Sequence, residues 1–246
     1  MHGPTHRRRP RMTADSSTQL LAEQIAYYGA RAQEYEQWFR REGRYSRGPD
    51  ADARWFTEFE ITRERLRSFG ARGDVLEIAC GTGQPTSILA ETATTLTAID
   101  AASAMIAEAR RRPELETVRF EHADIFEWEP PGTFDAVVFT FWLSHVPADR
   151  APAFWDLVYG CLAPGGRVFF ADSLYAPWAT AIDHELEGPG GTSVTRRLND
   201  GREFRIVKRF FEPVMLEKEL RQLGWNVAVR ATGDLLLTGE GEARRP

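Results

Sequence analysis

Short apolar runs alternate with amphipathic stretches of helical period from residue 74 onward. The runs predicted as strands are Val75–Ala79, Thr95–Ile99, Val118–Phe120, Phe134–Thr140 and Arg167–Ala171. The helices predicted between them are Pro85–Ala93, Ala102–Arg112 and Arg150–Leu162. Strands that are apolar throughout and alternate with helices predict a parallel sheet that is covered on both faces.

The C-terminal part departs from this alternation. Asn199-Asp200-Gly201 stands between the strand-like runs Val194–Arg197 and Phe204–Arg209, which predicts a β-hairpin. A helix is expected over Glu212–Leu223, with Gly224 as its end.

Two closing strands follow, Trp225–Ala231 and Leu235–Thr238. Only Thr232-Gly233-Asp234 separates them, which is too short for a parallel crossover. The pair must therefore be antiparallel.

Two helices are expected before the alternating region. Apolar and aromatic side chains recur near helical spacing from Leu20 to Tyr35. A second helix is predicted to begin with Asp50 as its N-cap, directly after Pro49. We assign residues 17–70 to an N-terminal helical cap, residues 71–246 to the core, and the hairpin region of about 184–210 to a second cap element.

Residues 1–16 are polar and contain Pro and Arg, and we predict a disordered tail there, with Met12 as an alternative start. A basic arm that touches nucleic acid is the less favoured interpretation. The chain has 246 residues, 42% of them hydrophobic, and a net charge of -5, which argues for one folded domain and against a general nucleic-acid binder.

No apolar run approaches the roughly 20 residues that a membrane span needs, and the start lacks an apolar signal region. The two cysteines show no sign of pairing, and no Cys/His cluster has zinc spacing, so no metal is expected. These features predict a cytoplasmic protein with no membrane partner; a homo-oligomer is left open.

The first candidate ligand-binding feature of the sequence is a glycine turn. Gly81 and Gly83 directly follow the first strand, and Pro85 stands at the first position of the predicted helix. Glycines let backbone N–H groups approach a nucleotide-like ligand where a side chain would collide. Alone, this turn is a weak indication, since many doubly wound proteins have one.

Three acids sharpen the prediction. Asp100 ends the second strand, where it can accept both ribose hydroxyls of a ligand at the carboxyl edge of the sheet. Asp124 ends the third strand and can take an adenine amino group, while the Ile125 amide meets the ring. Glu77 lies inside the first strand, where burial is costly unless a cationic ammonium or a water chain reaches it.

With these residues in place, the sequence resembles the class I S-adenosylmethionine-dependent methyltransferases. Val75–Gly83 is similar to their first motif, with Ala79 where the family often has its first glycine. Thr97–Met105 resembles the second motif, and Asp124-Ile125 the third. Phe134–Val138 and Leu162–Arg167 resemble the fourth strand and the turn before the fifth.

The resemblance implies a Rossmann-like, doubly wound α/β fold with a seven-stranded sheet, mostly parallel with an antiparallel C-terminal strand, and S-adenosylmethionine as cofactor. In the family the aspartate of the second motif binds ribose, and an apolar residue such as Met105 backs the adenine. The residues expected to bind the cofactor are Tyr28, Arg31, Glu77, Ala79, Gly81, Gly83, Asp100, Ala101, Met105, Asp124, Ile125 and Thr140.

The main rival within this fold class is a nicotinamide-dependent oxidoreductase. Its fingerprint calls for a third glycine at Thr86 and does not predict Asp124. A protein that binds the cofactor without turnover, as a partner of other proteins, is a further alternative.

His145 is the candidate catalytic base, because it follows the fourth strand at the edge where the methyl group is expected. Packing on Trp142 or capping is the competing interpretation. The residues expected on the acceptor side are Tyr35, Trp142, His145 and Asp172, although Asp172 is as well explained as a cap or a surface acid. His184 is expected to be exposed.

In many small-molecule members of the family an N-terminal helical segment closes over the cofactor, so the resemblance implies a lid of Tyr28, Arg31 and Tyr35, with Arg31 pairing with the cofactor carboxylate. Ordinary helix packing of these aromatic side chains is the alternative. The segment after the fourth strand, Thr140–His145, lacks the Pro-Pro-aromatic motif of amine-methylating enzymes that act on bases or glutamine. An aromatic cap over an apolar cleft predicts a small, partly apolar acceptor, with oxygen, nitrogen and carbon all open.

Overall fold

The computed structural model describes residues 14–186 and 188–244. Most of the predicted tail, residues 1–13, lies outside the described residues. Residues 14–16, which the sequence placed in that tail, form the first turn of a helix. None of the described helices is long and apolar enough to cross a membrane.

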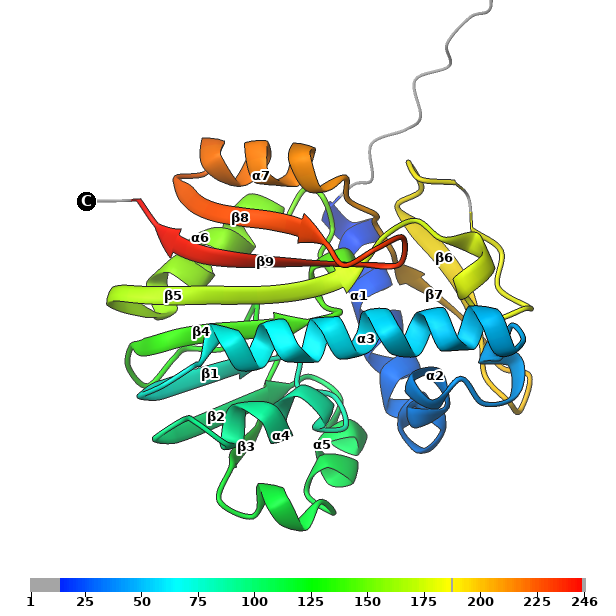
Figure 1. The fold of residues 1–246 in the computed structure, drawn as a ribbon, viewed down its shortest axis with the longest axis horizontal. Helices are drawn as coiled ribbons and strands as arrows, with labels where there is room; N and C mark the ends of the chain where they lie inside the picture. The colour runs from blue at the N-terminus through cyan, green and yellow to red at the C-terminus, as the bar shows by residue number, and fades with distance from the viewer. Residues whose placement is uncertain (1–13, 187, 245–246) are drawn as a thin grey trace, which may run out of the picture.

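Seven strands form one sheet, in the order β3-β2-β1-β4-β5-β9-β8 (Figure 1). All neighbours are parallel except β9, which runs antiparallel to both β5 and β8. The strands are β1 Asp74–Ile78, β2 Thr95–Asp100, β3 Arg119–His122, β4 Phe134–Thr140, β5 Leu162–Ser173, β8 Trp225–Ala231 and β9 Leu236–Ala243. The predicted fold class is confirmed.

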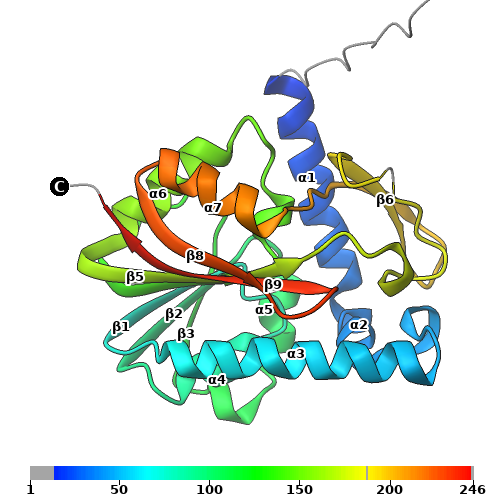
Figure 2. The ribbon, with the colours of Figure 1, turned by 45° about the horizontal axis from the view of Figure 1, so that its top comes forward.

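Helices cover both faces of this sheet. Figure 2 shows α6 and α7 on one side and α3 and α4 on the other. The helices that flank the sheet are α3 Pro49–Phe69, α4 Gln84–Ala90, α5 Ser103–Ala109, α6 Ala151–Cys161 and α7 Pro213–Gln222. Alternate strand residues supply the two cores: Val137 and Phe139 pack towards α6 and α7, and Ala136 and Val138 towards α3 and α4.

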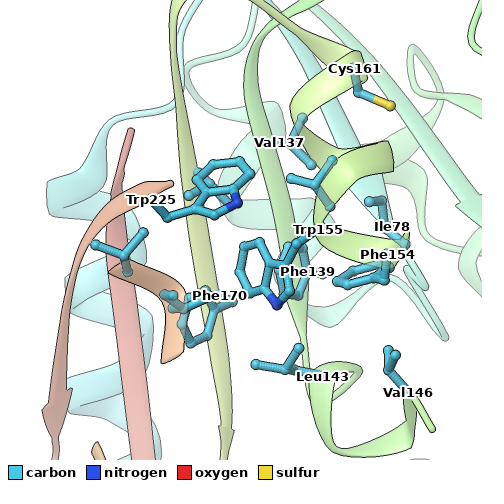
Figure 3. Close-up of a cluster of buried hydrophobic side chains, with 14 of the residues drawn as sticks. Ile78, Val137, Phe139, Leu143, Val146, Phe154, Trp155, Cys161, Phe170 and Trp225 are labelled. Atoms are coloured by element: carbon cyan, nitrogen blue, oxygen red, sulfur yellow. The ribbon is translucent and has the colours of Figure 1, made fainter. Parts of the chain in front are cut away.

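Aromatic rings fill the core beside α6. Figure 3 shows Trp155 among Phe139, Phe170 and Trp225, which come from β4, β5 and β8. The ring centroids of Trp155 and Trp225 lie 5.1 Å apart and meet edge to face, a favoured aromatic geometry. This packing joins α6 to β4, β5 and β8 on one face of the sheet.

A cap stands beyond the carboxyl ends of the parallel strands. It consists of α1 Ala14–Arg31, α2 Glu36–Arg40 and a separate two-stranded sheet, β6 Ser193–Arg197 with β7 Glu203–Val207. Figures 1 and 2 both place α2 and the hairpin past the arrowhead of β5, with α1 running beside it. Tyr27 of α1 packs on Val194 and Ile206 of the hairpin, so segments far apart in sequence form one layer.

The structure divides the predicted cap of residues 17–70. The end of α3 belongs to the sheet layer, because Leu66 and Phe69 pack in the core with Val75 of β1. This helix begins at Pro49, not after an Asp50 cap, since proline has a helical φ and suits the first position. β5 begins at Leu162, earlier than predicted, with a register shift opposite Phe134 and Ala136.

Candidate functional site

Two adjoining cavities lie between the cap and the carboxyl ends of the strands, and both are open to solvent. The lining of the first, called the loop cavity here, includes Ala79, Gly81, Asp100, Met105, Asp124 and Thr140. The lining of the second, the cap cavity, includes Arg31, Trp38, Tyr45, His184, Arg196 and Lys208. Tyr28, Tyr35, Phe141 and His145 border both.

The glycine turn after β1 is a tight loop held by its neighbours. Ala79, Gly81 and Gly83 have φ of 56°, 56° and 83°. A Cβ on Gly83 would lie 2.7 Å from the side chain of Leu115, so no larger residue fits there without a shift. The N–H of Gly81 donates to Oδ2 of Asp100 at 2.9 Å, which ties the loop to the end of β2.

Ala79 holds a left-handed backbone that favours glycine, so Ala79→Gly is expected to raise the free energy of unfolding by about 0.5–1 kcal/mol. The strain of about 1–2 kcal/mol outweighs the extra chain entropy that glycine loses. Chemical denaturation of the cofactor-free protein measures the change. Ala107→Gly, in the middle of α5, is the control and should lower stability; an equal loss in both variants would contradict the strain argument.

Asp100 presents a carboxylate to the loop cavity. Its Oδ1 accepts the N–H of Ala102 at 2.8 Å and its Oδ2 that of Gly81, and each oxygen keeps a further lone pair. Burial raises the pKa of Asp100 to about 6. A fixed carboxylate with free lone pairs fits two neighbouring hydroxyls, as the ribose of an adenosine would offer.

One part of the loop cavity is lined by apolar side chains. Met105 and Ile125 are buried, and Asp124 lies beside them with Oδ1 accepting the N–H of Phe126 at 3.0 Å. An apolar surface with a carboxylate at its rim fits a purine ring that carries an amino group. The donor and acceptor set of the loop cavity therefore fits an adenosine.

Glu77 lies deeper in β1 and is only 1% exposed. Burial raises the pKa of Glu77 to about 8, so the carboxyl group is mainly protonated at neutral pH. Its Oε2 has no hydrogen-bond partner among the described residues. The sequence suggested that burying the Glu77 carboxylate would cost free energy. Protonation removes the charge and so avoids that cost.

The two cavities meet at an aromatic junction. Phe141 follows β4 with a φ of 56°, and its N–H donates to the carbonyl of Ala171 at 2.7 Å. Its ring packs edge to face on Trp38 of α2, with centroids 4.8 Å apart. The strained backbone therefore presents Phe141 between the loop cavity and the cap.

His145 uses both ring nitrogens within the protein. Nδ1 donates to the carbonyl of Val207 at 2.7 Å, which leaves Nε2 to accept the O–H of Tyr28 at 2.8 Å. Burial and the cations Lys208, Arg196 and Arg31 hold the pKa of His145 well below its usual value. The imidazole is therefore neutral and a weak base in this arrangement.

The cap cavity gathers cationic side chains from three segments. Arg31 is buried, donates to the hydroxyl of Tyr45 at 3.0 Å, and lies over the Tyr35 ring. Arg196 is half-buried and donates to the Thr180 hydroxyl at 3.0 Å. Within residues 14–186 and 188–244, neither guanidinium forms an ion pair with a carboxylate.

Lys208 contrasts with these arginines because it is paired. Its Nζ lies 3.5 Å from Oδ1 of Asp172 and donates to the Ser144 hydroxyl at 2.9 Å. Asp172 also accepts the backbone N–H of Ser144 at 2.8 Å. The pair thus fixes the short segment that carries His145.

Known proteins with similar sequences and structures are described as methyltransferases or as complexes with S-adenosylmethionine (SAM) or S-adenosylhomocysteine (SAH). A family model described as a methyltransferase domain matches residues 75–166. The ubiquinone biosynthesis O-methyltransferase of Xanthomonas euvesicatoria is 31% identical over 173 residues, which is 67% of this chain and 66% of the relative. A DhpI–SAH complex and a DhpI–SAM–HEP complex align over 92% of this chain and 98% of theirs, with a TM-score of 0.75 and 38% and 40% identity.

The chain belongs to the S-adenosylmethionine-dependent methyltransferases. The family resemblance and the cofactor predicted from the sequence are thereby confirmed. The chain spans 66% of the length of the curated O-methyltransferase that it matches.

The structure of this methyltransferase brings together most of the residues predicted for the cofactor. Tyr28, Ala79, Gly81, Asp100, Ala101, Met105, Asp124, Ile125 and Thr140 all line the loop cavity. Arg31 instead lines the cap cavity, and Glu77 and Gly83 line neither. Gly83 acts through the loop, whose course it permits.

Only some of the residues predicted on the acceptor side line the cap cavity. Tyr35 and His145 border the cap cavity, but Trp142 lines only the loop cavity. Asp172 is wholly buried and lines neither cavity, because its carboxylate is used by Ser144 and Lys208. It is thus neither the surface acid nor the acceptor contact that the sequence suggested.

Sequence reasoning missed His184, Arg196 and Lys208 among the residues that line the cap cavity of this methyltransferase. The prediction that His184 is exposed is wrong: it is buried and takes a hydrogen bond from Arg196. Burial, together with Arg196, lowers the pKa of His184 to about 2, so it stays neutral. The only available indication of Arg196 and Lys208 was their position within the two predicted strands of the hairpin, Val194–Arg197 and Phe204–Arg209.

Proposed function

We propose that this methyltransferase binds S-adenosylmethionine in the loop cavity and methylates an anionic oxygen of a small, partly apolar metabolite in the cap cavity. The observation that carries the proposal is the pair of guanidiniums of Arg31 and Arg196, which lack carboxylate partners among the described residues. They line a cavity that shares Tyr28, Phe141 and His145 with the loop cavity.

Burying an unpaired cation costs folding free energy unless an anion reaches it. Burial lowers the pKa of Arg196, in line with this cost. Lys208 needs no such ligand, since Asp172 already neutralises it. An anionic acceptor would therefore complete the arginine side of the cavity.

The remaining walls of the cap cavity suit an apolar group. Trp38 and Trp55 lie edge to face with centroids 4.8 Å apart, and Phe210 and Leu235 complete this lining. A metabolite with one anionic group and a short apolar part would use both kinds of wall.

Methylation of an oxyanion agrees with the finding that His145 is neutral and a weak base. Gly81, Asp100 and Asp124 would hold S-adenosylmethionine in the loop cavity, and the bound cofactor would supply an activated methyl group and leave as a neutral thioether. An oxyanion has no proton to lose, so no general base is required. His145, neutral and held at both nitrogens, would position Tyr28 at the junction and help exclude water.

Two relatives support this direction. One is named an O-methyltransferase, and the DhpI–SAM–HEP complex pairs SAM with a further small molecule. Both are properties of those proteins, and they favour a small acceptor methylated on oxygen.

A panel of matched acceptors tests the proposal. The purified protein is incubated with S-adenosylmethionine and with small alkyl and aryl carboxylates, phosphates and phosphonates, each paired with its uncharged amide or ester. We expect S-adenosylhomocysteine and a methyl ester to form, as measured by mass spectrometry, only from oxyanion members. Equal turnover of the uncharged partners would refute the anionic acceptor, and cofactor binding without any transfer would favour the non-catalytic alternative.

A further inference from the structure

Glu36, the first residue of α2, connects the cap to the glycine loop. Its carboxylate accepts hydrogen bonds from the Thr82 hydroxyl and from the Gln84 amide, and it pairs with Arg112 at 3.0 Å. Thr82 lies between the two glycines of the loop and is only 3% exposed. Three side chains of the core thus converge on a single carboxylate of the cap.

Arg112 closes this network on its other side. Its Nε donates to the carbonyl oxygen of Thr82 at 2.7 Å, while its NH2 group donates to Glu36. The hydroxyl and the carbonyl of Thr82 are therefore both held, one by the cap and one by the segment after α5. Such closed networks restrict a loop more than a single hydrogen bond does.

The contact sits next to the groups that face the loop cavity. Gly81, beside Thr82, donates its N–H to Asp100, and the ring of Tyr35, beside Glu36, comes within 3.7 Å of the position of a Cβ on Gly81. Tyr35 borders both cavities. Holding Thr82 therefore places Gly81 against Asp100 and Tyr35 over the loop at the same time.

We propose that Glu36 is a positioning residue that latches the cap onto the glycine loop and thereby sets how fast the cofactor and its product enter and leave. Breaking its contacts frees both the loop amides and the Tyr35 cover. The inference rests on the loop cavity as the cofactor site and is independent of the acceptor.

The Glu36 network can affect the global stability of the protein or the dissociation rate of the ligand, depending on how strong its interactions are. The Arg112 and Glu36 side chains are 25% and 19% exposed, so water screens their ion pair only in part, and some loss of global stability is expected besides the effect on release. The network bridges two elements that must separate for exchange, so its loss should appear mainly in the dissociation rate.

The test measures release of S-adenosylhomocysteine from the full chain without any acceptor, by stopped-flow displacement. We expect Glu36→Ala to release it at least tenfold faster. Glu36→Gln, which can still accept from Thr82 but loses the charge opposite Arg112, should lie between that variant and the wild type. Thr82→Val, which keeps the Glu36–Arg112 pair, should also accelerate release. Hydrogen exchange of the 81–83 amides in the cofactor-free Glu36→Ala protein should be faster.

Glu42→Ala is the matched control, since it removes an exposed glutamate just after the same helix. Unchanged release in Glu36→Ala, or the same acceleration in Glu42→Ala, would overturn the latch. A lower melting temperature of Glu36→Ala with unchanged release would also overturn it, because that result describes a purely structural contact. If Asp100→Ala leaves binding of S-adenosylhomocysteine intact, the cofactor site itself is misplaced, which is a separate failure.

Discussion

Arg196→Met is expected to lower kcat/KM for an anionic acceptor roughly 30- to 150-fold, or by about 2–3 kcal/mol, while the affinity for S-adenosylmethionine stays the same. This is the scale of losing charge-assisted hydrogen bonds to an anion in a sheltered site. Arg196 lines the cap cavity and not the loop cavity, so the loss should fall on the acceptor alone. Initial rates at saturating cofactor, with cofactor binding by calorimetry, provide the measurement.

The stability of the same variant separates a ligand role from a structural role. Arg196 has no carboxylate partner among the described residues and lies among other cations, so its removal should leave the unfolding free energy level or raise it. Arg202→Met, an exposed arginine of the same hairpin, is the control for both readouts. Lost stability together with unchanged kcat/KM in Arg196→Met would assign the residue to folding.

Arg31→Met tests whether Arg31 binds the cofactor, as the sequence suggested, or the acceptor, as its place in the structure suggests. The sequence predicted a contact with the cofactor carboxylate, whereas the structure places Arg31 in the cap cavity, over Tyr35 and beside Tyr45. On our proposal, this variant should resemble Arg196→Met. A selective loss of cofactor affinity would restore the assignment made from the sequence.

Asp100→Ala is expected to weaken the binding of S-adenosylmethionine by about 1.5–3 kcal/mol, or roughly 10- to 150-fold. The substitution removes the ribose acceptor and also frees the Gly81 amide that Oδ2 now holds. Calorimetric titration measures the change, and an unaltered affinity would mean that the ribose lies elsewhere.

The raised pKa of Asp100 gives that binding a pH dependence of known sign. Burial raises the pKa to about 6 in the cofactor-free protein, so the carboxylate is ionised above pH 6 and protonated below it. The ionised form is the better acceptor for hydroxyl groups, so cofactor affinity should fall as the pH drops from about 7 to 5. Asp100→Asn should bind more weakly at pH 7 and lose this dependence. An equally steep pH profile in Asp100→Asn would assign the titration to another group.

The cofactor side of the site could be read from local patterns, and the acceptor side could not. Asp100 and Asp124 each follow a predicted strand, and parallel strands end at one edge of a sheet, so both were expected beside the glycine turn. Asp172 also ends a strand, yet Lys208 and Ser144 use its carboxylate. Position at a strand end therefore did not suffice once a partner came from a distant segment.

For His145, too, the sequence predicted the position of the residue but not the contacts that distant segments make with it. Its place after β4 was predictable, but its bonds to Tyr28 and Val207 come from residues more than 60 positions away in each direction. Those bonds, with the nearby cations, make it a neutral positioning group in our proposal instead of a base.

The sequence by itself determined the alternating strands and helices, the glycine turn and the acidic strand ends, because each depends on residues a few positions apart. Only the tertiary structure decided which charges face the acceptor. Arg31 lies on α1, Arg196 on β6 and Lys208 just after β7, and these segments share a cavity because α1 packs on the hairpin beyond the sheet. No spacing in the chain encodes that contact, which arises from burying the apolar faces of the two segments against each other.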